Sequence, residues 1–170
     1  VVDILRVNPQ NIWIINERFS YGIDIWNESR QAWDYIDLES YDGSNNSPSI
    51  NKAADGSVWI GGHHSIHRYK NGEFSVYALE DLGLSKAFCH VVPFGKDRLA
   101  VMLRSIGVYD VDLSTKTWRT FEDLHYQCDS KGKYSWFLDG THGHVVRHNT
   151  ETDDWTAFTA KDGIIDNAVA

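Results

Sequence analysis

The chain repeats one short pattern four times, and this repetition limits the folds open to it more than any other property of the sequence. Each copy begins with an aromatic residue, has a second bulky residue three positions later, and follows a polar turn. The copies are Trp33-Asp34-Tyr35-Ile36, Phe74-Ser75-Val76-Tyr77, Trp118-Arg119-Thr120-Phe121 and Trp155-Thr156-Ala157-Phe158. Their first residues lie 41, 44 and 37 positions apart. Such spacing predicts an architecture in which one supersecondary unit is used several times.

Shorter runs of β-branched and aromatic residues precede each copy, and turn residues separate them. The runs immediately upstream are 22–26, 65–69, 106–111 and 143–148, and those before them are 11–15, 57–61, 98–102 and 134–138. The lead runs are 1–7, 47–53, 87–94 and 124–129, of which 47–53 is the weakest. Tryptophan occupies the middle of the second run in three copies, as Trp13, Trp59 and Trp136, and Ala100 replaces it in the third copy. The composition and spacing of these runs are typical of short β-strands.

Four strands joined by tight turns make a unit of about 40 residues, which is the size of a propeller blade. We therefore predict an all-β fold, a β-propeller of four-stranded antiparallel blades with four blades in this chain. The expected blades are residues 1–46, 47–86, 87–123 and 124–161 of a single domain spanning 1–170, with 162–170 leading into a further or closing strand. Strand alternation predicts that the tryptophan side chains lie between blades, which explains the 13% aromatic content without a ligand.

The pattern leaves the closure of the ring open. The four blades form either a complete small propeller or part of a larger one. An open arc exposes two apolar sheet faces and sheet edges, which are liabilities in isolation. For an open arc we expect a homodimer or additional propeller blades to cover these faces.

Charge and motif content exclude several kinds of partner. The 24 acidic residues outnumber 16 scattered basic ones, for a formal net charge of -8, and this argues against nucleic acid, since phosphate contacts need clustered Lys and Arg. No apolar run approaches the roughly 20 residues of a membrane helix, so we expect no membrane insertion within this chain. Nucleotide and dinucleotide fingerprints are absent, and no cofactor is predicted. Cys89 and Cys128 form no CxxC motif and fit either a disulfide or two free thiols.

The second copy carries the most specific pattern. The sequence "DGSVWIGG" (55–62), followed by "SIHRYKNGEFSVY" (65–77), resembles the blades of the two-component regulator propeller family, with Gly62 where that family usually has threonine. Residues 158–170, "FTAKDGIIDNAVA", resemble the linker between its blades. The resemblance implies an extracytoplasmic, periplasmic or extracellular, ligand sensor of a bacterial signalling protein. A more distant likeness is to the streptogramin lyase group, propellers that carry out chemistry.

Candidate ligand-binding residues gather in the loops between the second and third strands and in one interblade linker. Blade connectivity brings these loops to one rim of a propeller, and function is commonly located on such loops. The rim candidates are Arg18, Tyr21, His63, His64, Arg104 and His142, with Phe19 and His144 at related positions. Arginine, histidine and aromatic side chains in one ring suit a small anionic or sugar-like ligand. The turns at the opposite end, including Asp153 and Asp154, are explained by turn formation alone.

Metal binding and catalysis receive less support than ligand binding. Neighbouring residues on a strand point to opposite faces, so His63 and His64 would not share a ligand there, and no HExxH or CxxC motif is present. We predict no metal site and assign no catalytic residue. The favoured function is a non-catalytic ligand- or partner-binding module. An enzyme is less favoured, and that question stays open. The alternatives are a lyase or hydrolase with a histidine general base, and a lectin with aromatics exposed at the same position in each blade.

Overall fold

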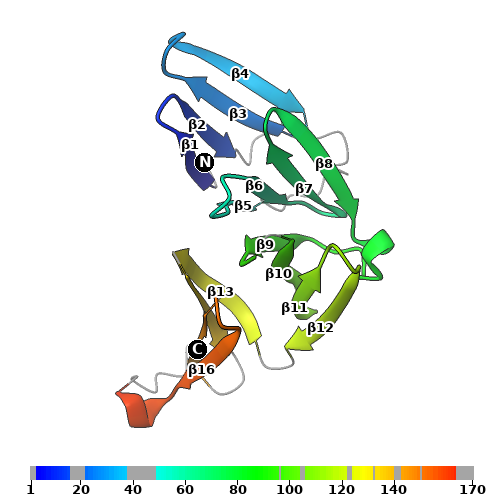
Figure 1. Ribbon diagram of the computed structural model, residues 1–170, viewed down its shortest axis with the longest axis vertical. Coiled ribbons are helices and arrows are strands. Elements are labelled where there is room, and N and C mark those ends of the chain that lie inside the picture. Colours follow the sequence, from blue (N-terminus) through cyan, green and yellow to red (C-terminus); the bar gives the residue numbers. More distant parts are fainter. Residues whose placement is uncertain are drawn as a thin grey trace. The chain divides into compact units, whose positions relative to one another are not determined.

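The computed structural model describes residues 3–15, 22–37, 49–95, 97–103, 106–121, 124–131, 133–139, 143–149 and 151–163. Within them the chain forms four antiparallel sheets of four strands each, and in every sheet the strands follow one another in chain order (Figure 1). The helical segments of this described part are two single 3-10 turns, η1 (Glu80–Leu82) and η2 (Ala160–Asp162). None of its helices is long and apolar enough to cross a membrane.

The strands of each sheet are short and evenly sized. The first sheet contains β1 (Asp3–Asn8), β2 (Asn11–Ile15), β3 (Gly22–Asn27) and β4 (Ala32–Asp37). The second contains β5 (Ser49–Lys52), β6 (Val58–Gly61), β7 (Ser65–Lys70) and β8 (Glu73–Ala78). The third contains β9 (Cys89–Pro93), β10 (Arg98–Leu103), β11 (Gly107–Asp112) and β12 (Thr117–Phe121). The fourth contains β13 (Leu124–Lys131), β14 (Tyr134–Asp139), β15 (His144–Asn149) and β16 (Asp154–Phe158).

These sheets confirm the all-β propeller fold and the four-strand unit predicted from the sequence. Even the weak lead run of the second copy forms a strand, β5. The backbone repeats as well, because each turn between the third and fourth strands holds one non-glycine residue at positive φ. These residues are Gln31, Asn71, Lys116 and Asp153, with φ of 50°, 52°, 55° and 60°. The four sheets are therefore copies of one unit in turn geometry as well as in strand order.

By their contacts the residues divide into two compact units, Val1–Pro93 and Phe94–Ala170. The first unit holds the first two sheets and β9, and the second holds β10–β12 and the fourth sheet. The predicted division into blades within a single domain stays a prediction, as does the choice between a complete and a partial ring.

In the first unit, apolar alternation along β2 builds a core between the first two sheets. Trp13 is only 2% exposed and belongs to one buried cluster with Ile15, Ile23 and Val58. Its ring centroid lies 4.9 Å from that of Tyr69 on the second sheet. Burial of such a large aromatic surface is a dominant stabilising contribution in a small sheet protein.

The second sheet and β9 approach each other closely at Gly61. A Cβ atom at this position would lie 2.2 Å from the carbonyl oxygen of Cys89, so any side chain here would displace the backbone. The Cys89 amide donates to the Gly62 carbonyl at 2.8 Å, and the Asn51 side chain donates to the Val91 carbonyl at 2.8 Å. Gly61, the last residue of β6, is therefore required for this packing. Cys89 is a buried free thiol, and burial raises its pKa to about 12.

In the second unit, aromatic rings fill the space between β10–β12 and the fourth sheet. Phe121 and Trp155 lie with ring centroids 4.3 Å apart, and His148 stacks on Trp155 at 4.1 Å. Phe94 contacts the edge of the His148 ring at 4.8 Å. His148 thus occupies, in the core of the second unit, the strand position that Tyr69 has in the second sheet.

The expectation that the tryptophans are interior is only partly right. Trp13 and Trp59, on the second strands, are buried as predicted. Trp33 and Trp118, on the fourth strands, are 57% and 43% exposed. Because the fourth strand is the edge of its sheet, a neighbouring sheet covers it less completely than it covers the central strands. Phe74 at the same position is 37% exposed, but Trp155 is partly buried, so the exposed aromatic that a lectin-like function would require in each blade is missing from the fourth sheet.

Candidate functional site

The predicted rim falls mostly outside the described part of the chain. Arg18, Tyr21, Arg104 and His142 all lie outside the described residues. His63 and His64 are described, and they lie in the loop between β6 and β7 and not on a strand. The rim of six residues therefore stays a prediction.

The two described histidines contact each other. Their ring centroids are 4.0 Å apart with the planes at 80°, and His63 Nδ1 lies 2.8 Å from His64 Nε2. Backbone hydrogen bonds hold their loop, since the Gly62 amide donates to Ser65 at 3.0 Å and the Leu79 amide donates to His64 at 2.9 Å. No group of three or more metal-ligating side chains occurs among the described residues.

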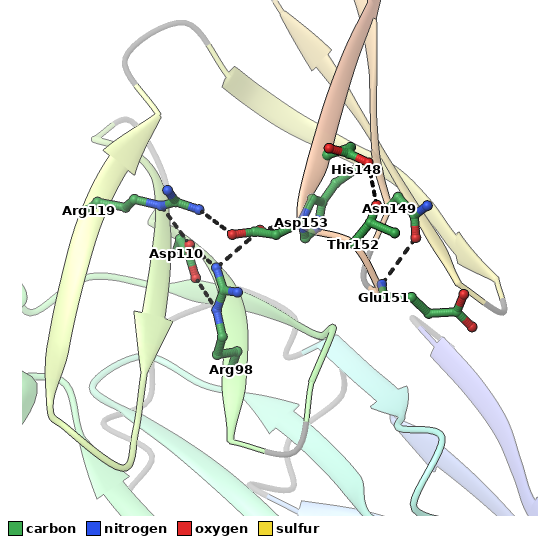
Figure 2. Close-up of polar contacts among 9 residues, drawn as sticks. Arg98, Asp110, Arg119, His148, Asn149, Glu151, Thr152 and Asp153 are labelled. Carbon is green, nitrogen blue, oxygen red and sulfur yellow. Dashed lines mark hydrogen bonds and ion pairs between the residues drawn. The ribbon is translucent and has the colours of Figure 1, made fainter.

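A charged cluster that the sequence analysis did not predict lies in the second unit. Figure 2 shows Arg98 and Arg119 directed toward Asp110, with Asp153 opposite them. The register explains why three of these side chains share one face of the third sheet. Asp110 pairs with Ala100 on one side and with Arg119 on the other, and Arg98 lies two residues from Ala100 on the same strand. Because side chains alternate along a strand, all of them project from that face.

The carboxylate of Asp110 holds both guanidinium groups. Arg98 donates to it through its terminal nitrogen at 2.5 Å and through Nε at 3.3 Å, and Arg119 donates through Nε at 2.8 Å. Asp110 is only 5% exposed, while the two arginines are partly or largely exposed. Charge-assisted bonds of this kind orient the planar guanidinium groups and leave their remaining N–H donors available.

The fourth sheet contributes Asp153 from the turn between β15 and β16. Positive φ at Asp153 and the bond from its amide to the Asn149 carbonyl at 2.8 Å fix this turn. The Asp153 carboxylate lies 3.4 Å from nitrogen atoms of both Arg98 and Arg119, and 2.8 Å from His148 Nε2 (Figure 2). A turn residue thus connects a buried histidine to the two arginines.

Burial and hydrogen bonding act differently on the pKa values of His148 and Asp153. Burial lowers the pKa of His148, and its hydrogen bond to Asp153 only partly opposes that effect. Burial also opposes ionisation of Asp153, but hydrogen bonds from His148 and Arg98 outweigh it and hold the pKa of this carboxyl below its ordinary value. At neutral pH the pair is therefore a neutral imidazole bound to a carboxylate.

A cavity of about 350 Å³ opens beside the cluster. It is lined by Arg98, Asp110, Asp112, Thr117, Trp118, Arg119 and Asp153. Trp118 presents an exposed ring that is braced edge-on by Tyr109, with centroids 5.3 Å apart. The Trp118 ring, however, lies with Tyr109 on the opposite face of the third sheet from Asp110 and Arg119, because Trp118 is adjacent to Arg119 on β12. The side chains that face the cavity are therefore guanidinium donors and carboxylate acceptors, which can hydrogen-bond a polar molecule.

The buried histidine predicts a pH dependence of stability. The unfolded chain has a histidine pKa near 6.5 and the folded one a lower value, so the unfolded state takes up the proton first as the pH falls. The free energy of unfolding should therefore decrease below about pH 6.5, until the lowered pKa is passed. Urea unfolding of wild type and His148→Phe, between about pH 7.5 and 5.5, measures this contribution, and the variant should have the shallower pH dependence.

Two other titratable groups, His67 and Asp153, also contribute to the pH dependence of stability. The pKa of His67 in the first unit is also lowered by burial, so part of the pH dependence should remain in His148→Phe and decrease further when His67→Phe is added. Asp153 adds a separate loss below its ordinary pKa of 3.8, outside this window. Equal slopes in wild type and His148→Phe would contradict the assignment.

The third copy differs from the second and fourth copies at two paired positions, and these differences were a sequence signal for the charged cluster. In register, Trp59 pairs with Arg68 and Trp136 with Arg147. The third sheet has Ala100 and Asp110 at these two positions. Loss of the large ring leaves space, and the change from arginine to aspartate supplies the anion that the two arginines bind. The prediction that Asp153 forms a turn is confirmed, but its contacts with three charged or polar side chains were missed.

Solved structures of low sequence identity share this fold. No family model matches the chain, and no curated protein matches it. Virginiamycin B lyase from Staphylococcus aureus is 14% identical with a TM-score of 0.62, and the match covers 92% of this chain and 54% of the lyase. The extracellular domain of a putative hybrid two-component system from B. thetaiotaomicron is 15% identical with a TM-score of 0.64, and the match covers 90% of this chain and 22% of that one. A second such domain, of a putative one-component system from the same organism, is 16% identical with a TM-score of 0.59, over 94% of this chain and 19% of that one.

These likenesses agree with the fold predicted from the resemblance to regulator propellers. Extracellular domains of two-component systems are among the structural neighbours, and one neighbour is a lyase. The chain spans about half the length of the lyase and about a fifth of the length of the extracellular domains.

Proposed function

We propose that this chain is a non-catalytic, ligand-binding propeller module of an extracytoplasmic sensor. The observation that carries the proposal is the cavity in which Asp110 holds Arg98 and Arg119 in place. Groups that are already oriented lose little conformational entropy when a ligand arrives. The extracellular neighbours support a location outside the cytoplasm.

The chemistry of the cavity favours a sugar-like ligand over a simple anion. Three carboxylates, from Asp110, Asp112 and Asp153, line it together with two guanidinium groups, so a ligand with several negative charges meets repulsion. A polyhydroxylated ring can donate hydroxyl protons to the carboxylates and accept hydrogen bonds from the arginines. A ring with a single carboxylate fits the same groups.

The alternative function, a lyase or hydrolase with a histidine general base, requires a histidine that the substrate can reach. His148 beside Asp153 is the kind of pair that a lyase or hydrolase with a histidine base would use. However, the His148 ring is fully buried between Phe94 and Trp155 and does not line the cavity. Burial of the imidazole supports binding over catalysis at this site.

Calorimetric titration with neutral and uronic-acid disaccharides tests the proposal. We expect one or more of them to bind wild type, with affinity reduced at least about tenfold in Arg119→Ala, since a hydrogen bond to a charged group contributes about 1.5–3 kcal/mol. Arg30→Ala is the matched control, because Arg30 is an exposed arginine whose ion pair with Asp34 lies in the first sheet.

Three results would count against the proposal. Failure of every disaccharide to bind would remove the sugar-like ligand class. Undiminished binding by Arg119→Ala would place the site elsewhere, for instance at the predicted rim. Conversion of a bound disaccharide to products, detected by mass spectrometry of the incubated ligand, would favour the enzyme.

A further inference from the structure

Each sheet of the repeat has two different faces, and one contact in the first unit shows how they fit. Trp13, from the second strand of the first sheet, contacts Tyr69 and Phe74, from the third and fourth strands of the next sheet. We call the face that bears the second-strand tryptophan the tryptophan face. The face that bears the two rings of the third and fourth strands is called the aromatic-pair face.

The tryptophan face of the fourth sheet is open by comparison. Trp136 takes the position of Trp13, as the middle residue of the second strand, but it is only half-buried, and Leu138 beside it is 38% exposed. On the same face, the Trp136 ring lies 5.8 Å from Phe158, and the Arg147 guanidinium covers the Tyr134 ring at 4.7 Å. This is an ordered aromatic surface with the composition of a sheet-to-sheet contact.

The aromatic-pair face of the first sheet is exposed as well. Trp26 pairs in register with Trp33, as Tyr69 does with Phe74 in the second sheet. The ring centroids of Trp26 and Trp33 are 5.2 Å apart at 56°, against 5.0 Å and 49° for Tyr69 and Phe74. The aromatic pair of the first sheet therefore has nearly the same geometry as the pair that contacts Trp13 in the second sheet, and Trp33 is exposed to solvent.

We propose that the tryptophan face of the fourth sheet binds the aromatic-pair face of the first sheet in a second copy of this chain. The chain carries both halves of a contact that it already makes internally through Trp13, so a second copy supplies the complementary surface. The interface is heterologous, because two different surfaces meet. This inference is independent of the proposed ligand site.

Sedimentation velocity over a range of concentrations tests the association. We expect wild type to self-associate, and Trp33→Glu and Leu138→Glu each to be monomeric, because a charge at either face leaves no intact pair of surfaces in a homogeneous sample. Both side chains are exposed, so neither substitution threatens folding. Ile106→Glu, an equally exposed apolar residue away from both faces, is the control and should associate like wild type.

Mixing the two variants gives the decisive result. Trp33→Glu retains an intact fourth-sheet face and Leu138→Glu an intact first-sheet face, so an equimolar mixture should form a 1:1 heterodimer although each variant alone is monomeric. A wild-type chain that stays monomeric at about 0.5 mM would overturn the proposal. Self-association of Trp33→Glu alone would also overturn it, since it would show that two fourth-sheet faces pair with each other.

Discussion

Replacing Trp13 with alanine is expected to lower the free energy of unfolding of the first unit by about 3–5 kcal/mol. The indole is 2% exposed and fills the space between the first two sheets, against Tyr69 and Phe74. Its removal loses the transfer free energy of a large aromatic surface and leaves a cavity that two hydrogen-bonded sheets cannot close. Trp13 and Trp59 are the two largest fully buried side chains among the described residues.

Alkylation of Cys89 as a function of urea measures this loss within the first unit. The Cys89 thiol is fully buried and its pKa is raised to about 12, so it reacts only when the unit opens. The modified peptide must be identified by mass spectrometry, because Cys128 is a second cysteine. Trp33→Ala removes the same side chain from an exposed position and should cost below about 1 kcal/mol in dilute, monomeric protein. Equal costs for the two variants would show that the Trp13 contact does not hold the sheets together.

Replacing Asp110 with alanine is expected to destabilise the second unit by about 2–3 kcal/mol and to abolish binding in the cavity. The substitution leaves Arg98 and Arg119 side by side, with Asp153 at 3.4 Å as the remaining counter-charge from the cluster. Removing one partner of a fully buried pair costs about 3–5 kcal/mol, and the partial exposure of both arginines reduces that figure here. Released guanidinium groups also lose the orientation that a ligand requires.

A double-mutant cycle separates these charge effects from packing. Asp110→Ala combined with Arg119→Met should cost less than the sum of the single variants, because it removes the repulsion between the arginines. Peptide-resolved hydrogen exchange over residues 98–121 in urea gives the stability of the strands concerned. Asp154→Ala, at the exposed aspartate that begins β16 next to Asp153, is the control and should change stability by below about 0.5 kcal/mol. Strict additivity of the single costs would mean that Asp110 acts through its own burial and not through the arginines.

The strands were predictable because their signals are local. Alternation places Trp13 and Trp59 inside, and "DGS" at residues 55–57 forms a turn in which the Ser57 amide donates to the Asp55 carboxylate at 3.0 Å. The exposure of Trp33 and Trp118 was not predictable in this way, since alternation assigns a face to a residue but not the extent to which another sheet covers it. Coverage depends on whether the strand lies at the edge of its sheet.

The candidate site was less predictable, because its members come from separate segments. The sequence analysis selected His63 and His64 from a histidine-rich segment. In the structure these two side chains contact each other, and the other four rim residues lie outside the described part of the chain. Asp153 was assigned to a turn, correctly, while its carboxylate also binds His148 and lies beside two arginines of another sheet. Aspartate is so common in turns that its presence in one carries no information about such partners.

The sequence by itself determined the repeat, the sheet order and the positions of all the described strands. These follow from signals with a period of two residues within a strand and about 40 residues between units, both visible along the chain. Only the tertiary structure decided that Asp110, Arg119 and Asp153 meet at one cavity, and that His148 is buried next to Asp153. Strand register and the packing of one sheet on another bring these side chains together, and neither has a local pattern in the sequence.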